Sequence, residues 1–180
     1  MKKILLVLLV FTSLTATADK YFTKTGQISF FSKAPLEDIE AHNKKVGILL
    51  NTSTGSLNFS LLIKNYVFSN SLMQQHFNEK YLESDKYPKS ILAGKIEDIE
   101  KIDFNINGTY SVQVIGSLNI HGVTQKISEQ GIIIVTDGMV SVQSSFKVAV
   151  KDYNITIPSL VGKKIADVVT ITIDANLKKI

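Results

Sequence analysis

The chain contains no cysteine and no arginine, and both absences narrow the functions that its 180 residues can perform. Without cysteine there is no disulfide, no thiolate nucleophile and no thiolate zinc site, so the fold must be held by its apolar core. Without arginine there is no rigid, bidentate clamp for a phosphate or carboxylate group, because every basic residue is a lysine. The formal net charge of +4 is mild and interspersed, which argues against binding nucleic acid.

The first 18 residues have the organisation of a secretory signal peptide. Lys2 and Lys3 give a positive start, residues 4–11 form a short apolar run, and residues 16–18 (ATA) match a small-x-small cleavage pattern. The apolar run is too short to span a bilayer, so we expect no stable membrane insertion. The sequence therefore predicts a signal peptide over residues 1–18, a single domain over residues 19–180, and export to the periplasm, with full secretion as the alternative.

One segment, SLMQQHFNEKYLESDKYP at residues 71–88, interrupts an otherwise strand-like chain. Its periodicity predicts one amphipathic helix of three turns over Ser71–Leu82. Asn70 or Ser71 can cap the start of this helix, and Pro88 prevents it from continuing far beyond Leu82. The apolar side of the predicted helix combines Leu72, Met73, His76, Phe77, Lys80 and Tyr81. That side needs a partner, which the rest of the chain must supply.

Most of the remaining chain alternates apolar and polar residues at the period of a β-strand. The alternation predicts eight strands, at residues 21–31, 45–51, 57–63, 90–96, 110–120, 123–135, 140–150 and 169–177. Phe22, Ile28 and Phe30 alternate along the first strand, although Phe31 breaks the pattern, and residues 36–41 (LEDIEA) are predicted to form a helical turn across one end. Glycine-containing turns such as Asn107-Gly108 and Asp137-Gly138 separate the later strands.

Eight alternating strands joined by short turns indicate an antiparallel meander. A sheet of this size either closes on itself or packs on a second sheet, because open edges promote aggregation. Eight strands is also the number at which a closed barrel can hold one small ligand. The predicted fold is an all-β, eight-stranded antiparallel lipocalin-like barrel, with the helix inserted between strands 3 and 4 at the mouth or flank. A sandwich filled entirely by side chains is the alternative.

Four sequence features together resemble the YceI-like family of exported, lipocalin-like barrels. They are Phe30-Phe31, the segment HFNEKYLESDKYP, the hairpin GSLNIHGVTQKI and the late stretch KVAVKDYNITIP. The resemblance covers nearly all of residues 19–180 and implies an eight-stranded barrel with a tunnel-like apolar interior. Members of this family are associated with polyisoprenoids, including quinone or diphosphate forms, or with other fatty-chain amphiphiles.

The lack of arginine favours a ligand with an uncharged head group, such as a quinone or an amide, over a diphosphate. Lys80, Lys86 and Lys89 could still hold an anion as point charges. The expected partner is therefore an apolar long-chain small molecule, held in the barrel interior by the hydrophobic effect. For the wall of the site the sequence predicts Phe30, Leu57, Phe59, Tyr110, Val112, Val114, Leu118 and Phe146. For the mouth it predicts Met73, His76, Phe77 and Tyr81, with Tyr87 behind them. The alternative is that these side chains simply pack on one another.

Other chemistries have weaker support in the sequence. His76 and Glu79 are spaced to reach one metal ion, but two ligands do not make a site, and local hydrogen bonding is the alternative for His76. His121 precedes Gly122 at a predicted hairpin, which favours a turn role over a catalytic one. No nucleophile with a base and an orienting group is recognisable, so we predict neither an enzyme nor a cofactor or metal site. A protein-binding or chaperone-like envelope module is the alternative function, and a homodimer is possible.

Overall fold

The computed structural model describes residues 19–34, 36–157 and 165–180, and the predicted signal peptide lies outside this part of the chain. The strands are β1 (Lys20–Lys33), β2 (Asp38–Asn51), β3 (Ser56–Leu62), β4 (Val67–Phe68), β5 (Lys89–Ile96), β6 (Gly108–Ile120), β7 (Val123–Thr136), β8 (Met139–Ala149) and β9 (Val168–Lys179). The helical elements are α1 (Ser71–His76), the π-helical η2 (Phe77–Tyr81), and three 3-10 turns, η1 (Ile63–Asn65), η3 (Ile99–Lys101) and η4 (Val150–Tyr153).

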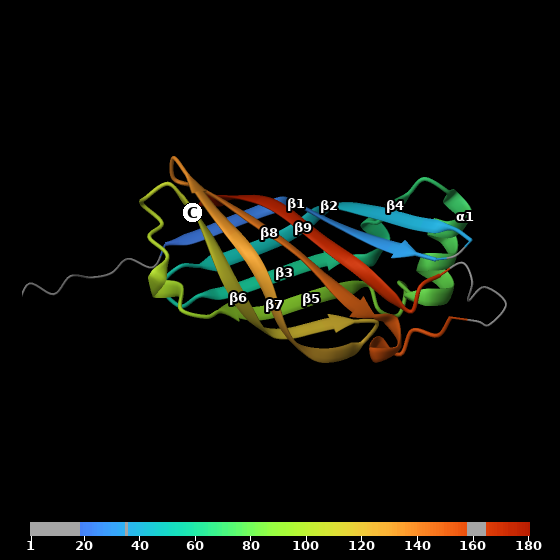
Figure 1. Ribbon diagram of the computed structural model, residues 1–180. Helices are drawn as coiled ribbons and strands as arrows, with labels where there is room; N and C mark the ends of the chain where they lie inside the picture. Colours follow the sequence, from blue (N-terminus) through green and yellow to red (C-terminus); the bar gives the residue numbers. More distant parts are fainter. Residues whose placement is uncertain (1–18, 35, 158–164) are drawn as a thin grey trace, which may run out of the picture.

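Eight of the strands form one closed antiparallel barrel, as the sequence predicts. The hydrogen-bonded order is β1-β9-β8-β7-β6-β5-β3-β2, and the pairing of β1 with β2 closes the ring. The two-residue strand β4 extends the sheet beside β2. Figure 1 shows an elongated barrel with α1 at one end and the C-terminus at the other. We call these the insert end and the far end.

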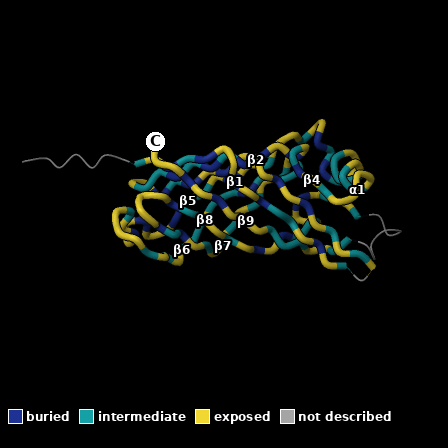
Figure 2. Tube along the Cα trace, turned by 90° about the horizontal axis from the view of Figure 1, so that it is seen from above, coloured by how far each residue is buried: buried dark blue, intermediate teal, exposed yellow. Residues whose placement is uncertain are grey.

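The strands form where apolar side chains alternate, and the alternation decides which residues face inward. In β2, Val46, Ile48 and Leu50 are fully buried, and β3 alternates in the same way. Figure 2 shows buried and exposed residues alternating along the strands. The far end of the barrel is filled by aliphatic side chains that are at most 1 % exposed: Val46, Ile48, Leu50, Ile96, Ile133, Val135, Val140 and Leu177.

Two local predictions about the first hairpin are wrong. A register shift between Thr23 and Gly26 in β1 exchanges the two faces, so Tyr21 and Thr23 are buried on the side that Ile28 and Phe30 share, and Phe22 is not. Gly26 fits at this shift because a Cβ atom there would lie 2.8 Å from Cδ1 of Ile48. The predicted helical turn at residues 36–41 is strand from Asp38 onward, because it pairs with the end of β1.

The insert consists of α1 and η2 (Ser71–Tyr81). It starts as predicted but does not continue as one α-helix. The Asn70 side chain caps α1 by accepting hydrogen bonds from the backbone N–H groups of Leu72 and Met73, at 2.9 and 3.3 Å. The α-helix ends at His76, and η2 continues it as a π-helical turn. Such widened turns rotate the following side chains relative to an α-helix. Within the described ranges, the structure has no helix with the length and hydropathy needed to cross a bilayer.

Candidate ligand cavity

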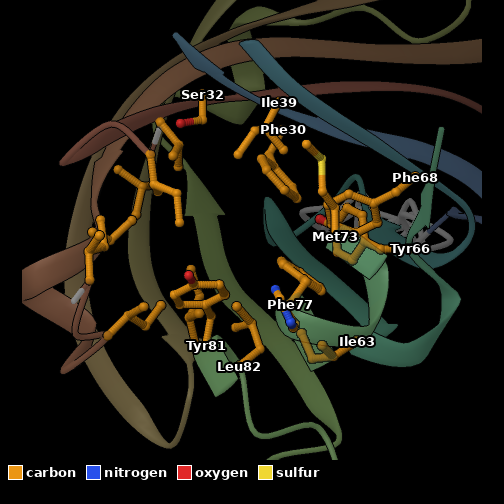
Figure 3. A pocket seen from close by; sticks show the side chains of 18 of the residues that line it. Phe30, Ser32, Ile39, Ile63, Tyr66, Phe68, Met73, Phe77, Tyr81 and Leu82 are labelled. Atoms are coloured by element: carbon orange, nitrogen blue, oxygen red, sulfur yellow. The ribbon is translucent and has the colours of Figure 1, made fainter. Parts of the chain in front are cut away.

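A cavity of about 400 Å³ occupies the barrel interior at the insert end. Ligand-binding pockets in proteins typically have about this size or more. Figure 3 shows side chains from the barrel wall and from the insert converging on an open centre. The described lining consists of Phe30, Ser32, Glu37, Ile39, Ile63, Tyr66, Phe68, Asn70, Leu72, Met73, His76, Phe77, Tyr81, Leu82, Ser90, Ile120, Val148, Val150, Ile155, Ile157, Ile165, Val169 and Ile171.

Aromatic rings fix the insert to the barrel wall on one side of this cavity. The Phe77 ring stacks on Phe30 of β1 with centroids 5.4 Å apart, and it meets the rings of Tyr66 and Phe68 at 5.5 and 5.0 Å. Phe30 also makes edge contacts with both of those rings, at 5.7 Å each. Pairs in these geometries add to the gain from buried area. Phe77 is therefore both part of the cavity lining and the anchor of the insert.

The polar groups in the lining are mostly uncharged. They include the hydroxyl groups of Tyr66 and Tyr81, the imidazole of His76 and the amide of Asn70, with Glu37 as a carboxylate. Burial raises the pKa of both tyrosines above the usual value, so their hydroxyl groups stay protonated and can donate hydrogen bonds. Among the described lining residues there is no lysine, and Lys80, Lys86 and Lys89 are exposed.

A histidine holds three segments together at the rim of the cavity. His121 lies in the β6–β7 turn with a φ of 52°, which confirms its predicted turn position. Its Nε2 atom lies 2.8 Å from Oε2 of Glu83, just after the insert, and its Nδ1 atom lies 3.1 Å from the carbonyl oxygen of Tyr153 in η4. Both partners of the imidazole are oxygen atoms, one from a side chain and one from the backbone. The His121 ring therefore lies between the end of the insert and η4 and links both to the β6–β7 turn.

Tyr87 supports this rim from outside the cavity. Its ring meets the His121 ring edge-on with centroids 4.6 Å apart. Gly122, whose φ is 74°, leaves room for this contact, because a Cβ atom there would lie 2.5 Å from Cε1 of Tyr87. Tyr87 therefore positions the rim and does not line the cavity.

The predicted site residues divide into three groups. Phe30, Met73, His76, Phe77 and Tyr81 line the large cavity. A second space of about 40 Å³, which we call the lower chamber, lies deeper in the barrel. Its walls include the other predicted wall residues Leu57, Phe59, Val112, Val114 and Phe146.

Two predicted wall residues line neither space. Leu118 is 7 % exposed and packs in the core. Tyr110 is near the far end, where its hydroxyl group donates to the carbonyl oxygen of Asp103 at 3.2 Å. Both face inward by alternation, but alternation cannot tell a side chain that borders a space from one that fills it.

Three buried residues of the lining are not among the predicted site residues: Tyr66, Ile63 and Leu82. The available signal was the alternation of residues 57–63, which continues to Ile63 at the base of the insert. Tyr66 follows a 3-10 turn, where no strand or helix period applies. Another side of the cavity comes from residues that the sequence pattern divides among two strands and the connection between them: Val148, Val150, Ile155, Ile157, Ile165, Val169 and Ile171.

His76 and Glu79, the pair considered above as metal ligands, have separate surroundings in the structure. The Glu79 carboxylate accepts two hydrogen bonds from the Gln75 side chain, at 3.1 and 3.2 Å. His76 lines the cavity and has no hydrogen-bonded partner among the residues described. Nowhere in residues 19–34, 36–157 and 165–180 do three or more potential metal ligands lie together.

The chain belongs to the YceI-like domain family, whose model matches residues 10–177. No curated protein gives a significant match. Among solved structures, the barrel is similar to a polyisoprenoid-binding domain from Saccharophagus degradans that is implicated in plant cell wall breakdown. That match has a TM-score of 0.78 at 13% identity and covers 90% of this chain and 99% of the other.

Two further structures show the same fold. BcnA from Burkholderia cenocepacia matches with a TM-score of 0.67 at 15% identity, over 84% of this chain and 95% of its own. The YceI protein from Campylobacter jejuni matches with a TM-score of 0.56 at 14% identity, over 98% and 97% of the two chains. At these identities the likeness establishes the fold, and the ligand must be argued from this chain's own cavity.

Proposed function

We propose that this protein is a carrier or binding protein for a long-chain apolar amphiphile, such as a polyisoprenoid, an isoprenoid quinone or a fatty-acid derivative. The observation that carries this proposal is the 400 Å³ cavity inside the barrel, with aliphatic and aromatic side chains over most of its lining. The polyisoprenoid-binding domain of the same fold supports the ligand class. The function is binding rather than catalysis, and export by the N-terminal 18 residues would place the carrier in the periplasm.

The hydrophobic effect supplies the affinity in this proposal. Each buried methylene group contributes about 0.8 kcal/mol, so a chain of about ten carbons gains several kcal/mol before the cost of ordering it. Met73 on the insert suits such a ligand, because its flexible thioether adapts to different chain shapes. The cavity lies between insert and barrel wall, so chain length and branching would decide the fit.

The head group would meet uncharged hydrogen-bonding partners at the insert end. Tyr66, Tyr81 and His76 can each donate a hydrogen bond to a carbonyl or hydroxyl oxygen of the ligand, and each can also accept one from a hydroxyl group. A quinone, an amide or an alcohol satisfies these groups without bringing a charge into an apolar space. We therefore propose a neutral polar end rather than a diphosphate.

A displacement titration tests this function directly. N-phenyl-1-naphthylamine, a neutral apolar fluorophore, is bound first and then displaced by alcohols, methyl esters and isoprenoid quinones of increasing chain length. We expect affinity to rise with each added methylene up to the length that fills the cavity, and then to level off. If the fluorophore does not bind and no chain of any length gives a signal, the protein-binding alternative takes the place of the carrier.

A further inference from the structure

One polar side chain in the lining of the large cavity is enclosed by the protein but has no group to bond to. Tyr66 is 6 % exposed, and its hydroxyl group has no hydrogen-bonded partner among the described residues. Burial raises the pKa of this hydroxyl, with no contribution from a neighbouring group in the described part of the chain. Figure 3 shows Tyr66 across the open centre from Tyr81. A ligand that fills the cavity displaces water from this hydroxyl, so it has to supply an acceptor in its place.

The other polar groups of the described lining are bonded or reach solvent. Ser32, which is 1 % exposed, accepts a hydrogen bond from a backbone N–H group at 2.9 Å. Ser90 donates to a backbone carbonyl oxygen at 2.8 Å. The remaining polar lining residues are half-buried or exposed: Glu37, Asn70, His76 and Tyr81. Tyr66 is therefore the residue whose hydrogen bonding depends most on what the cavity holds.

The Tyr66 ring is fixed in place by the protein before a ligand binds. Its backbone N–H donates to the carbonyl oxygen of Ile63 at 3.1 Å, at the end of η1. The rings of Phe30 and Phe77 meet the Tyr66 ring edge-on, with centroids 5.7 and 5.5 Å away. A donor that is already positioned loses little conformational freedom on binding, so its hydrogen bond contributes more fully to affinity and selectivity.

The apolar surroundings of Tyr66 decide which kind of oxygen fits. The two phenylalanine rings that hold it offer no hydrogen-bond acceptor of their own. When Tyr66 donates to a carbonyl oxygen, the only proton of the pair is used. A ligand hydroxyl group brings a second proton, and one bond between two hydroxyl groups leaves one proton unpaired. A hydrocarbon leaves the Tyr66 proton unpaired, and an unpaired polar group in an apolar space is unfavourable.

We propose that Tyr66 is the specificity-determining residue of the cavity, and that it selects amphiphiles whose polar end carries a carbonyl oxygen. Ketones and esters then bind more tightly than alcohols or hydrocarbons of the same length. The Tyr66 hydroxyl donates, the carbonyl oxygen accepts, and no charge enters the apolar space. This inference rests on the proposed carrier function and narrows the class of ligand that the carrier takes.

The test compares 2-undecanone, 2-undecanol and undecane, which share one carbon skeleton and differ only in the oxygen that it carries. Each compound displaces N-phenyl-1-naphthylamine from the full chain. We expect the ketone to bind about tenfold more tightly than the alcohol or the hydrocarbon. Tyr66→Phe should abolish this preference and leave the midpoint of urea unfolding unchanged, because the hydroxyl makes no bond within the described protein. Tyr110→Phe, which removes a hydroxyl outside both spaces, is the matched control and should keep the preference.

The possible results separate this inference from the carrier function. Equal affinity of the ketone and the alcohol, or a ketone preference that survives in Tyr66→Phe, would overturn the inference while the carrier function stands. If neither the fluorophore nor any of the three compounds binds, the carrier function fails and the inference fails with it.

If Tyr66→Phe does not fold, the ketone labelled with ¹³C at its carbonyl group decides the question in the unsubstituted protein. Its infrared carbonyl stretch should lie at lower frequency when bound than in hexane, because the carbonyl oxygen accepts a hydrogen bond. The methyl group beside the carbonyl should give a nuclear Overhauser contact to the Tyr66 ring. An unshifted stretch, or a methyl group far from Tyr66, contradicts the inference.

Discussion

The two ends of the barrel are built from the same kind of strand but have opposite interiors. At the far end, fully buried aliphatic side chains meet across the barrel, and Tyr21 stacks on Phe104 at 6.0 Å. At the insert end, aromatic side chains line the wall and leave a space of about 400 Å³. The far end thus supplies stability through packing density, and the insert end keeps apolar surface available for a ligand. If this division is right, equal substitutions at the two ends must have different effects.

The largest expected difference comes from removing the same atoms at each end. Ile48→Ala at the filled end should lower the free energy of unfolding by about 3 kcal/mol, because it leaves a cavity among close-packed side chains. Ile171→Ala at the cavity wall should cost about 1 kcal/mol, because its side chain already borders empty space. Urea denaturation measures both. Equal losses would mean that the insert end is packed as tightly as the far end.

A charge at the centre of the aromatic cluster should abolish ligand binding. Phe77→Asp places a carboxylate among the rings of Phe30, Tyr66 and Phe68, where it opposes an apolar chain. Fluorophore displacement should show loss of uptake, while the far-UV circular dichroism keeps its β signal. Gln75→Asp, at an exposed position of α1, is the control. Unfolding of the Phe77→Asp protein would show that Phe77 belongs to the core that holds the barrel together.

The rim should loosen when the histidine bridge is removed. His121→Asn keeps a residue that tolerates the positive φ but is too short to join Glu83 to the carbonyl oxygen of Tyr153. We expect a loss of about 2 kcal/mol. Hydrogen exchange should become faster in residues 71–87 than at the far end. Uniformly faster exchange would show that His121 supports the whole barrel and not the rim.

The smallest effect is expected at the start of the insert. Asn70→Ala removes the cap of α1 and should cost about 1 kcal/mol of local stability. The midpoint of thermal unfolding should move only slightly, and ligand affinity should fall less than in Phe77→Asp. Ser71→Ala is the control, since Ser71 is exposed and Asn70 makes the capping bonds. A large change in the thermal midpoint would mean that the barrel depends on its insert.

The strands and their inward faces could be predicted from the sequence because alternation records which side of a strand is buried. The prediction failed where local geometry changes that period. The register shift at Gly26 exchanges the faces of β1, and the π-helical turn after His76 widens the insert. Neither change can be recognised from the spacing of apolar residues in the sequence. The first part of β2 was also not predicted, because Asn43 is a polar residue at an inward position and so breaks the alternation. Its side chain donates a hydrogen bond to the carbonyl oxygen of Leu62.

The sequence predicts an apolar binding site inside the barrel, but it does not predict that the interior is divided into two separate spaces. Aromatic residues on the insert and alternating residues on the strands indicated an apolar interior. Whether two inward side chains meet or leave a space depends on strand tilt and on contacts across the barrel. For that reason Phe30 and Phe59, which are equivalent in the sequence pattern, line two different spaces.

The most direct test of the hollow insert end is native mass spectrometry of the protein purified without detergent from its own host. The protein should carry a co-purified apolar adduct, and solvent extraction should release a long-chain molecule that rebinds with one-to-one stoichiometry. The adduct should be absent from Phe77→Asp and present in Gln75→Asp. If the unsubstituted protein shows only the mass of the polypeptide and takes up no added isoprenoid or fatty chain, the proposal that the cavity at the insert end binds a ligand is contradicted.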